Sequence, residues 1–282
     1  MATFILKFTC PDKKGIVATL AGALVELDAN ILNNAQFTDP STETFCMRTR
    51  FEAATYESAE LVRQLQPTAD SLGGVLELRR EDRNRRALIM VSKFDHCLVD
   101  LLYRKGSGEL PIDVPIVVSN HNDLRDAVLR AGLEFEHLPV TKENKPEAEQ
   151  RLLDLVDKHK VDFVVLARYM QILSDTFCAE MPGRIINIHH SFLPGFKGAK
   201  PYHQAWSRGV KLIGATAHYV TPDLDEGPII GQDVASVGHT QTPEQMVVRG
   251  RDVERLVLAN AVKAHAEDRI FLLDNARTVV FD

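Results

Sequence analysis

The sequence of 282 residues has no apolar run of roughly 18 residues, the length that a membrane-spanning helix needs. Its N-terminus, MATFILKFTCPDKKG, has too short an apolar stretch for a signal peptide, and a polar segment follows at once. The four cysteines, Cys10, Cys46, Cys97 and Cys178, show no C-x-x-C spacing, which argues against a disulfide framework or a zinc site. These absences predict reduced thiols and a cytoplasmic protein.

A basic surplus is also missing. The formal net charge is −6, and no stretch gathers the positive charge that marks a nucleic-acid-binding surface. The one dense charge cluster, RREDRNRR at residues 79–86, mixes both signs and is typical of a solvated linker. We therefore expect neither a nucleic acid nor a membrane as a partner.

The chain is 45% hydrophobic and 26% charged, which is ordinary globular composition for one large or two modest domains. Residues 1–80 show the order βαββαβ, with strands expected at 3–10, 29–39, 44–52 and 74–80 and helices at 16–28 and 56–73. This order is that of a small ferredoxin-like α+β unit. Pro67 is expected to break or kink the second helix.

A different pattern begins at Ala87. Near-continuous apolar strands, at 87–92, 115–120, 162–167, 184–189 and 211–220, alternate with helices at 96–105, 123–132 and 145–160. A last long helix covers 242–268, and Thr242 can cap it. Such a pattern predicts an α/β domain with a doubly wound, mostly parallel sheet covered on both faces. We expect a first domain at 1–80, a linker at 81–86 and a second domain at 87–282.

The strand RIINIH ends at Asn187, Ile188, His189 and His190. Positions i and i+2 of a strand face the same side, so Asn187 and His189 can address one substrate atom while His190 faces away. An amide N–H and an imidazole suit a developing oxyanion. The alternative is structural: an asparagine that caps the sheet end and a histidine bonded to a turn.

The loop VTPDLDEGPII supplies three acids, Asp223, Asp225 and Glu226, of which one could orient a histidine or take a proton from water. A solvated acidic turn is the alternative. His218, within an expected strand, is interpreted as a buried histidine of the core or behind the site. Neighbouring histidines on a strand point to opposite faces and no H-E-x-x-H is present, so we expect no metal.

Glycine is missing where a phosphate would bind. The first parallel strand, ALIMVS, is followed by KFDHCLVDLL, and no glycine occurs before Gly106. A phosphate-binding turn at this place would need glycines for close approach of its backbone N–H groups. This turn is therefore not a phosphate cradle.

Three segments, ARYMQILS, NIHHSFLPGFKGAKPYHQAW and GATAHYVTPDLDEGPII, together resemble the 10-formyltetrahydrofolate-dependent formyl-transfer fold, over about residues 87–282. The resemblance implies that Asn187, His189 and Asp225 form a catalytic triad. It also implies that the loop around YMQIL binds the folate, with the candidates Arg168, Met170, Ile172 and Leu173. It implies no cofactor beyond the folate substrate and no metal.

The N-terminal unit, with CPDKKGIVATLAGAL, resembles an ACT domain. An ACT domain before a formyl-transfer fold resembles the formyltetrahydrofolate deformylase family, which implies hydrolysis of 10-formyltetrahydrofolate to formate and tetrahydrofolate, with formate supplied to purine synthesis. It further implies a homo-oligomer and an amino-acid effector near Gly15, Asn30 and Asn33. Two alternatives stay open: a formyltransferase with an amine acceptor, and a non-catalytic amino-acid sensor. The absent glycine-rich turn and the ACT-like unit favour the deformylases.

Overall fold

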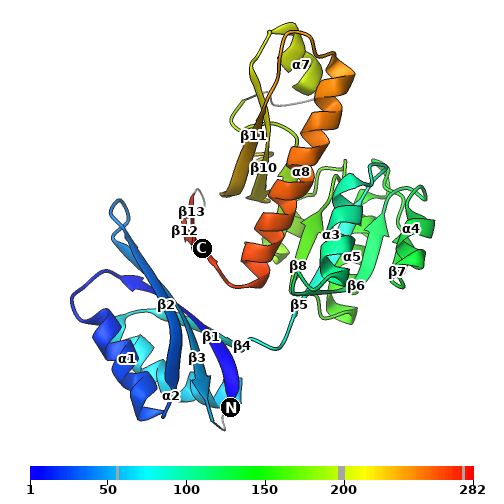
Figure 1. Cartoon of the computed structure of the whole chain (residues 1–282). Helices are drawn as coiled ribbons and strands as arrows, with labels where there is room; N and C mark the ends of the chain where they lie inside the picture. The colour runs from blue at the N-terminus through cyan, green and yellow to red at the C-terminus, as the bar shows by residue number, and fades with distance from the viewer. Residues whose placement is uncertain (55–56, 196–200, 275–276) are drawn as a thin grey trace. The chain divides into compact units, whose positions relative to one another are not determined.

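The computed structural model describes residues 1–54, 57–195, 201–274 and 277–282 (Figure 1). The chain divides into two compact units: Met1–Asn84 with Asp268–Leu273 and Val279–Asp282, and Arg85–Glu267 with Asp274–Thr278. We had expected the second domain to run without interruption to residue 282. Part of the C-terminal segment groups with the first unit instead, because the Asp268 carboxylate pairs with Arg79 and the Lys7 ammonium lies 4.9 Å from the ring centroid of Phe271.

The first unit has the expected βαββαβ order: β1 (Ala2–Pro11), α1 (Ile16–Glu26), β2 (Asn30–Asp39), β3 (Thr44–Ala53), α2 (Ser58–Leu72) and β4 (Val75–Arg80). Its sheet has the order β2-β3-β1-β4, with antiparallel pairs throughout. Alternate side chains of β1, Phe4 and Leu6, pack with Leu24 of α1 and Leu65 of α2, as a strand covered by helices requires. Pro67 lies inside α2, which continues to Leu72, so the expected break is wrong.

The described residues of the second unit between Arg85 and Ala266 form the following elements: β5 (Arg85–Val91), α3 (His96–Gly106), β6 (Ile112–Ser119), α4 (Arg125–Arg130), β7 (Glu134–His137), α5 (Lys145–Lys158), β8 (Phe163–Leu166), α6 (Asp175–Glu180), β9 (Ile185–His189), α7 (Pro201–Ser207), β10 (Leu212–Tyr219), β11 (Ile229–Ser236) and α8 (Pro243–Ala266). The seven-stranded sheet has the order β11-β10-β9-β8-β5-β6-β7. Its five strands from β9 to β7 pair in parallel, whereas β10 and β11 are antiparallel. The predicted mostly parallel sheet is confirmed. Two short strands, β12 (Ile270–Asp274) and β13 (Arg277–Val280), pair near the C-terminus and were not predicted.

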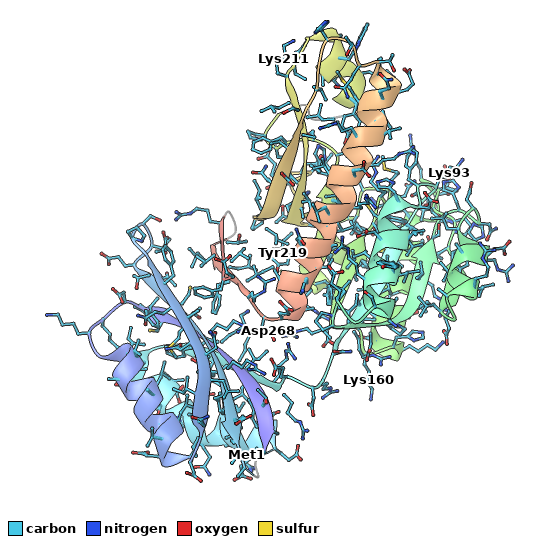
Figure 2. The ribbon with its side chains drawn as sticks, in the orientation of Figure 1. Met1, Lys93, Lys160, Lys211, Tyr219 and Asp268 are labelled. Carbon is cyan, nitrogen blue, oxygen red and sulfur yellow. The ribbon has the colours of Figure 1, made fainter. Side chains whose placement is uncertain are left out.

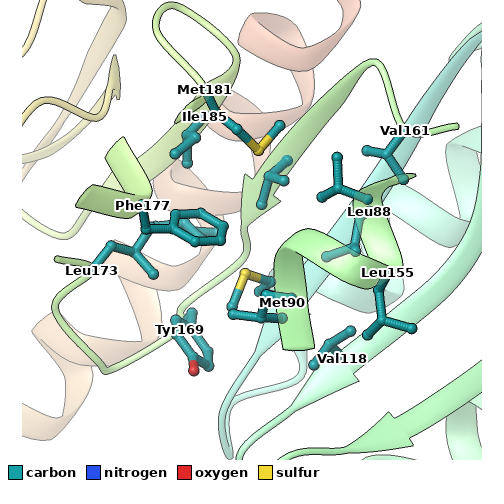
Figure 3. Packing of buried hydrophobic residues seen from close by; sticks show 14 of the residues in the cluster. Leu88, Met90, Val118, Leu155, Val161, Tyr169, Leu173, Phe177, Met181 and Ile185 are labelled. Atoms are coloured by element: carbon teal, nitrogen blue, oxygen red, sulfur yellow. The ribbon is translucent and has the colours of Figure 1, made fainter. Parts of the chain in front are cut away.

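The core lies on both faces of the large sheet. Leu88 and Met90 of β5 pack on one face with Leu155 of α5 and Phe177 of α6 (Figure 3). Ile89 points to the opposite face and is fully buried, so that face is covered too. Burial on both faces explains why the strand sequences are almost continuously apolar.

Helix α8 fixes the antiparallel end of the sheet. It runs along β10 and β11 (Figure 1), and the hydroxyl of Tyr219 lies 2.7 Å from Nδ1 of His265 (Figure 2 labels Tyr219). The predicted cap is confirmed: Thr242 accepts a hydrogen bond from the Gln245 backbone N–H, and the Gln245 side chain accepts one from the Thr242 N–H. Among the described residues, no helix has both the length and the apolar character needed to cross a membrane.

Candidate active site

A cleft of about 660 Å³ lies in the second unit. It is lined by side chains that follow β5 and β8, by the end of β9, by β10 with the loop after it, and by α7 and α8. Three of the parallel strands thus bring their following segments to one place, as is usual for ligand sites of α/β sheets.

Asn187 and His189 both line this cleft, as their spacing predicted. The antiparallel register of β9 and β10 places His218 directly opposite Asn187, with 3.1 Å between the Asn187 amide nitrogen and Nε2 of His218. Nδ1 of His218 lies 2.9 Å from the Tyr219 carbonyl oxygen. That carbonyl can only accept, so Nδ1 of His218 carries the proton and Nε2 accepts from Asn187. The amide orientation of Asn187 is thereby fixed, with its second N–H available to a ligand.

The loop between β10 and β11 places Asp225 beside both histidines. Its Oδ1 lies 3.1 Å from Nδ1 of His189 and 3.7 Å from Nε2 of His218. Asp225 has a left-handed φ of 57°, a strained conformation of the kind found at functional sites. Gly227 allows the loop to lie tightly on β10, because a Cβ there would be 1.7 Å from the Tyr219 carbonyl oxygen.

The imidazole of His189 is oriented by this contact. Since Nδ1 donates to the carboxylate of Asp225, Nε2 is the ring nitrogen left for chemistry. Nε2 is buried and has no hydrogen-bond partner among the described residues. An imidazole held from behind by a carboxylate, with its other nitrogen at a cleft, can donate a proton or a hydrogen bond to a bound substrate.

The electrostatics favour an ionised Asp225 beside a neutral His218. Burial acts to raise the pKa of Asp225, but the hydrogen bond from His189 and the electrostatic attraction of that imidazole bring the pKa below its ordinary value. Burial lowers the pKa of His218, which agrees with its role as an acceptor for Asn187. Sequence reasoning assigned His218 to the core; it is buried, and it also lines the cleft.

The four predicted folate-binding residues lie on the segment after β8 and all line the cleft. Met170 and Ile172 are exposed there, whereas Leu173 is part of the buried core. Arg168 is different, because its guanidinium is buried and turned toward Glu254, with 3.4 Å from Nε to Oε2. A hydrogen bond of 2.9 Å from the Met170 N–H to the hydroxyl of Ser92, the residue after β5, holds this segment in place.

Sequence reasoning missed several polar residues of the cleft. His190 lines it although we expected that side chain to face away, since β9 ends at His189 and strand alternation no longer applies. Glu254 of α8 is 1% exposed and was not singled out. The sequence feature that could have identified Glu254 is its position in the apolar stripe of a helix, between the buried Val253 and Val257.

One group of described residues has metal-ligand character: the ligand atoms of His96, Cys97 and Glu254 lie within 4.8 Å of one another. Two features oppose a cation there. Burial raises the pKa of Cys97 well above its ordinary value, which works against the thiolate form that a metal ligand needs. The guanidinium of Arg168 also supplies positive charge beside Glu254.

The predicted effector residues lie in the first unit. Gly15 precedes α1 with a φ of 93°, a backbone conformation that favours glycine. Asn30 and Asn33 are exposed on β2, opposite Glu52 and Arg50 of β3. They flank an irregularity in the pairing of the two strands.

Comparisons with known proteins agree with this site. The Formyl transferase family model matches residues 85–262. A formyltetrahydrofolate deformylase from Corynebacterium sp. (strain P-1) is 49% identical over 98% of this chain and 97% of its own. The solved structure of a formyltetrahydrofolate deformylase from Pseudomonas syringae pv. tomato str. DC3000 has a TM-score of 0.97 at 45% identity, and the match covers 100% of this chain and 95% of that one.

A glycinamide ribonucleotide transformylase from Symbiobacterium toebii is less similar, with a TM-score of 0.67 and 29% identity over 73% of this chain and 98% of its own. The two deformylases match the chain along nearly its whole length, whereas the transformylase matches about three quarters of it. The fold, the cleft residues and the full-length similarity together lead to one conclusion: the chain belongs to the formyltetrahydrofolate deformylase family.

Proposed function

We propose that this protein hydrolyses 10-formyltetrahydrofolate to formate and tetrahydrofolate in the cleft of its second unit. The observation that carries the proposal is the contact between Asp225 and His189, which leaves Nε2 of His189 at a cleft that Asn187 also lines. An amide donor, an oriented imidazole and an ionised carboxylate are the groups that hydrolysis of a formamide needs.

In the proposed mechanism, water attacks the formyl carbon and a C–O bond forms. Asn187 and protonated His189 donate hydrogen bonds to the oxyanion of the tetrahedral intermediate. Asp225 holds His189 through Nδ1 and takes up the proton that the attacking water loses. The bond from carbon to N10 then breaks as N10 receives a proton from His189. The proton on Asp225 returns to His189, and the formic acid loses its proton to solvent. Formate and tetrahydrofolate leave, so atoms and charge balance.

The folate lies, in this proposal, against the segment after β8. Met170 and Ile172 offer exposed apolar side chains to the pterin, and Leu173 anchors the segment in the core. Apolar side chains exposed to water are unfavourable, and a flat aromatic ligand that covers them removes this apolar surface from water.

The test of the proposed function is an assay without any amine. Purified full-length protein is incubated with 10-formyltetrahydrofolate, and formate and tetrahydrofolate are measured together. We expect both products in a one-to-one ratio, at a rate proportional to the protein concentration. A formyltransferase would release no formate under these conditions, and a non-catalytic sensor would leave the substrate intact.

No metal takes part in the proposed reaction, since the carboxylate and imidazole supply the proton transfers and Asn187 the oxyanion contact. We therefore predict that exhaustive treatment with a chelator leaves the rate of formate release unchanged. The rates of the treated and untreated protein are compared in metal-free buffer. Loss of activity that zinc restores would contradict the proposal and direct attention to His96, Cys97 and Glu254.

The first unit is proposed to assemble two or more copies and to bind an amino-acid effector near Gly15, Asn30 and Asn33. The support is β2, an edge strand of the sheet, most of whose residues are exposed. Its exposed apolar side chains include Leu32 and Phe37. Exposed apolar edges are ready to pair with another chain, and proteins usually protect them. The four buried, unpaired cysteines support a cytoplasmic location. In this proposal, the formate that the reaction releases is supplied to purine synthesis.

We predict that the double change Leu32→Lys and Phe37→Lys reduces the particle to a single chain of 31.5 kDa, because lysine on an edge strand opposes pairing. Light scattering measures the mass, and formate assays with glycine or methionine measure the response to effectors. Val25→Lys, an exposed site on α1, is the matched control. A wild-type protein that is already monomeric, or a variant of unchanged mass, would refute the assembly.

A further inference from the structure

A buried polar cluster forms one part of the cleft wall. Its centre is Glu254, which is 1% exposed and receives a hydrogen bond from the Tyr202 hydroxyl at 2.6 Å. Nε2 of His96 lies 2.8 Å from the other carboxylate oxygen, and Nε of Arg168 lies 3.4 Å from the same oxygen. The guanidinium of Arg168 is covered by Phe94, with 5.5 Å from Cζ to the ring centroid. We call Arg168, Glu254, Tyr202, His96 and Phe94 the polar wall.

The polar wall is costly to build. Removing a carboxylate and a guanidinium from water carries a desolvation penalty that their attraction often only repays. Arg168 also has a left-handed φ of 64°, which glycine adopts without strain and arginine does not. The chain nevertheless has a large, charged side chain at this position.

Helix α8 is adapted to the wall as well. A Cβ at Gly250 would lie 2.2 Å from the ring and the hydroxyl oxygen of Tyr202. Only glycine at this position lets Tyr202 lie against α8 and reach Glu254, one turn further along the helix. The polar wall therefore combines a strained backbone at Arg168, a required glycine and a buried ion pair. Such a combination is typical of functional sites.

The wall lies next to the reacting groups. The ring centroids of His189 and His190 are 5.2 Å apart, and those of His190 and Tyr202 are 6.2 Å apart. All five wall residues line the same cleft as Asn187 and Asp225. The exposed apolar side chains of Met170 and Ile172 offer a surface for the folate. We therefore place the attacking nucleophile on the other side of the cleft, beside the polar wall.

From these observations we infer that the polar wall determines the choice of nucleophile: it fills the space from which an amine would approach the formyl carbon and leaves room for water. The inference rests on the proposed function. A relative of this fold is named a glycinamide ribonucleotide transformylase, so the fold itself is compatible with a larger acceptor. The large side chains of the wall, above all Arg168, are the feature that excludes one here.

The test replaces Arg168 by glycine, which suits the φ of 64° and removes the guanidinium. Full-length wild-type and Arg168→Gly proteins receive 10-formyltetrahydrofolate together with glycinamide, a small primary amine. In the transfer reaction the amine nitrogen bonds to the formyl carbon, the bond from carbon to N10 breaks, and N10 gains the proton that the amine loses. Formate and N-formylglycinamide are both quantified, and a sample without protein corrects for spontaneous reaction.

We expect the wild type to form formate with at most a trace of N-formylglycinamide, and the ratio of N-formylglycinamide to formate to rise about 10-fold or more in Arg168→Gly, as for other changes of pocket volume. Ile172→Ala, on the folate side of the cleft, is the control: its ratio should equal that of the wild type. Formate release by the wild type tests the proposed function separately. An unchanged ratio in folded Arg168→Gly, or a folded variant that forms neither product, would overturn the inference.

A second variant protects the test against loss of folding. Phe94 is 40% exposed, so Phe94→Ala widens the cleft beside Arg168 without a large cavity in the core. If Arg168→Gly does not fold, the ratio of N-formylglycinamide to formate is measured with folded Phe94→Ala instead. A higher ratio than in the wild type supports the wall, and an equal ratio refutes it.

Discussion

Replacing Asp225 by asparagine should lower the rate of formate release by about 100-fold or more, because an amide neither accepts the proton of the attacking water nor holds His189 in the same tautomer. The 3.1 Å contact with Nδ1 of His189 is the structural basis of this expectation. Steady-state kinetics should show the loss in kcat, with the affinity for folate little changed.

Asp223→Asn is the matched control, since Asp223 belongs to the same loop, is exposed and does not line the cleft. Its rate should stay close to that of the wild type. The circular dichroism spectra of both variants should match that of the wild type. Near-normal formate release by Asp225→Asn would remove this carboxylate from the mechanism.

A second large effect is expected on stability. Glu254→Ala should lower the free energy of unfolding by about 3–5 kcal/mol, because it removes one partner of a buried ion pair. The change leaves the buried Arg168 charge without its carboxylate and leaves the Tyr202 hydroxyl without its acceptor. Urea denaturation of the full chain, followed by tryptophan fluorescence and circular dichroism, measures the loss.

Two comparisons make the stability result specific. Glu254→Gln keeps the size and an acceptor for Tyr202, so it should cost less than the alanine variant. Arg249→Ala, an exposed site on the same helix, should change the stability by less than about 0.5 kcal/mol. Equal stability of Glu254→Ala and Arg249→Ala would mean that the buried pair contributes nothing.

The fold was largely readable from the sequence because its signals are local and repeated. The βαββαβ order and the alternation after Ala87 predicted the two sheets, and Thr242 predicted the start of α8. Pro67 was misleading, because tertiary packing of Leu65 and Leu72 keeps α2 continuous around it. The grouping of Asp268 with the first unit depends on a contact with the distant Arg79, which no local pattern encodes.

The site was predictable to a different extent. The spacing of Asn187 and His189 placed both on one face, since strand alternation is a property of nearby residues. The role of His218 follows from the register of β9 and β10, and that of Glu254 from contacts with Arg168 and other distant residues. Such pairings join segments far apart in the chain, and they become visible only in the folded structure.

The most direct test of the account follows the formyl group itself. The full-length protein receives 10-formyltetrahydrofolate labelled with carbon-13 at the formyl carbon, in 18O-labelled water that also contains glycinamide, and mass spectrometry locates the label. If the cleft delivers water to the formyl carbon, as its residues predict, the carbon-13 is recovered as formate that carries one solvent oxygen. Recovery of the carbon-13 on the amine, or in unreacted substrate, would contradict the account.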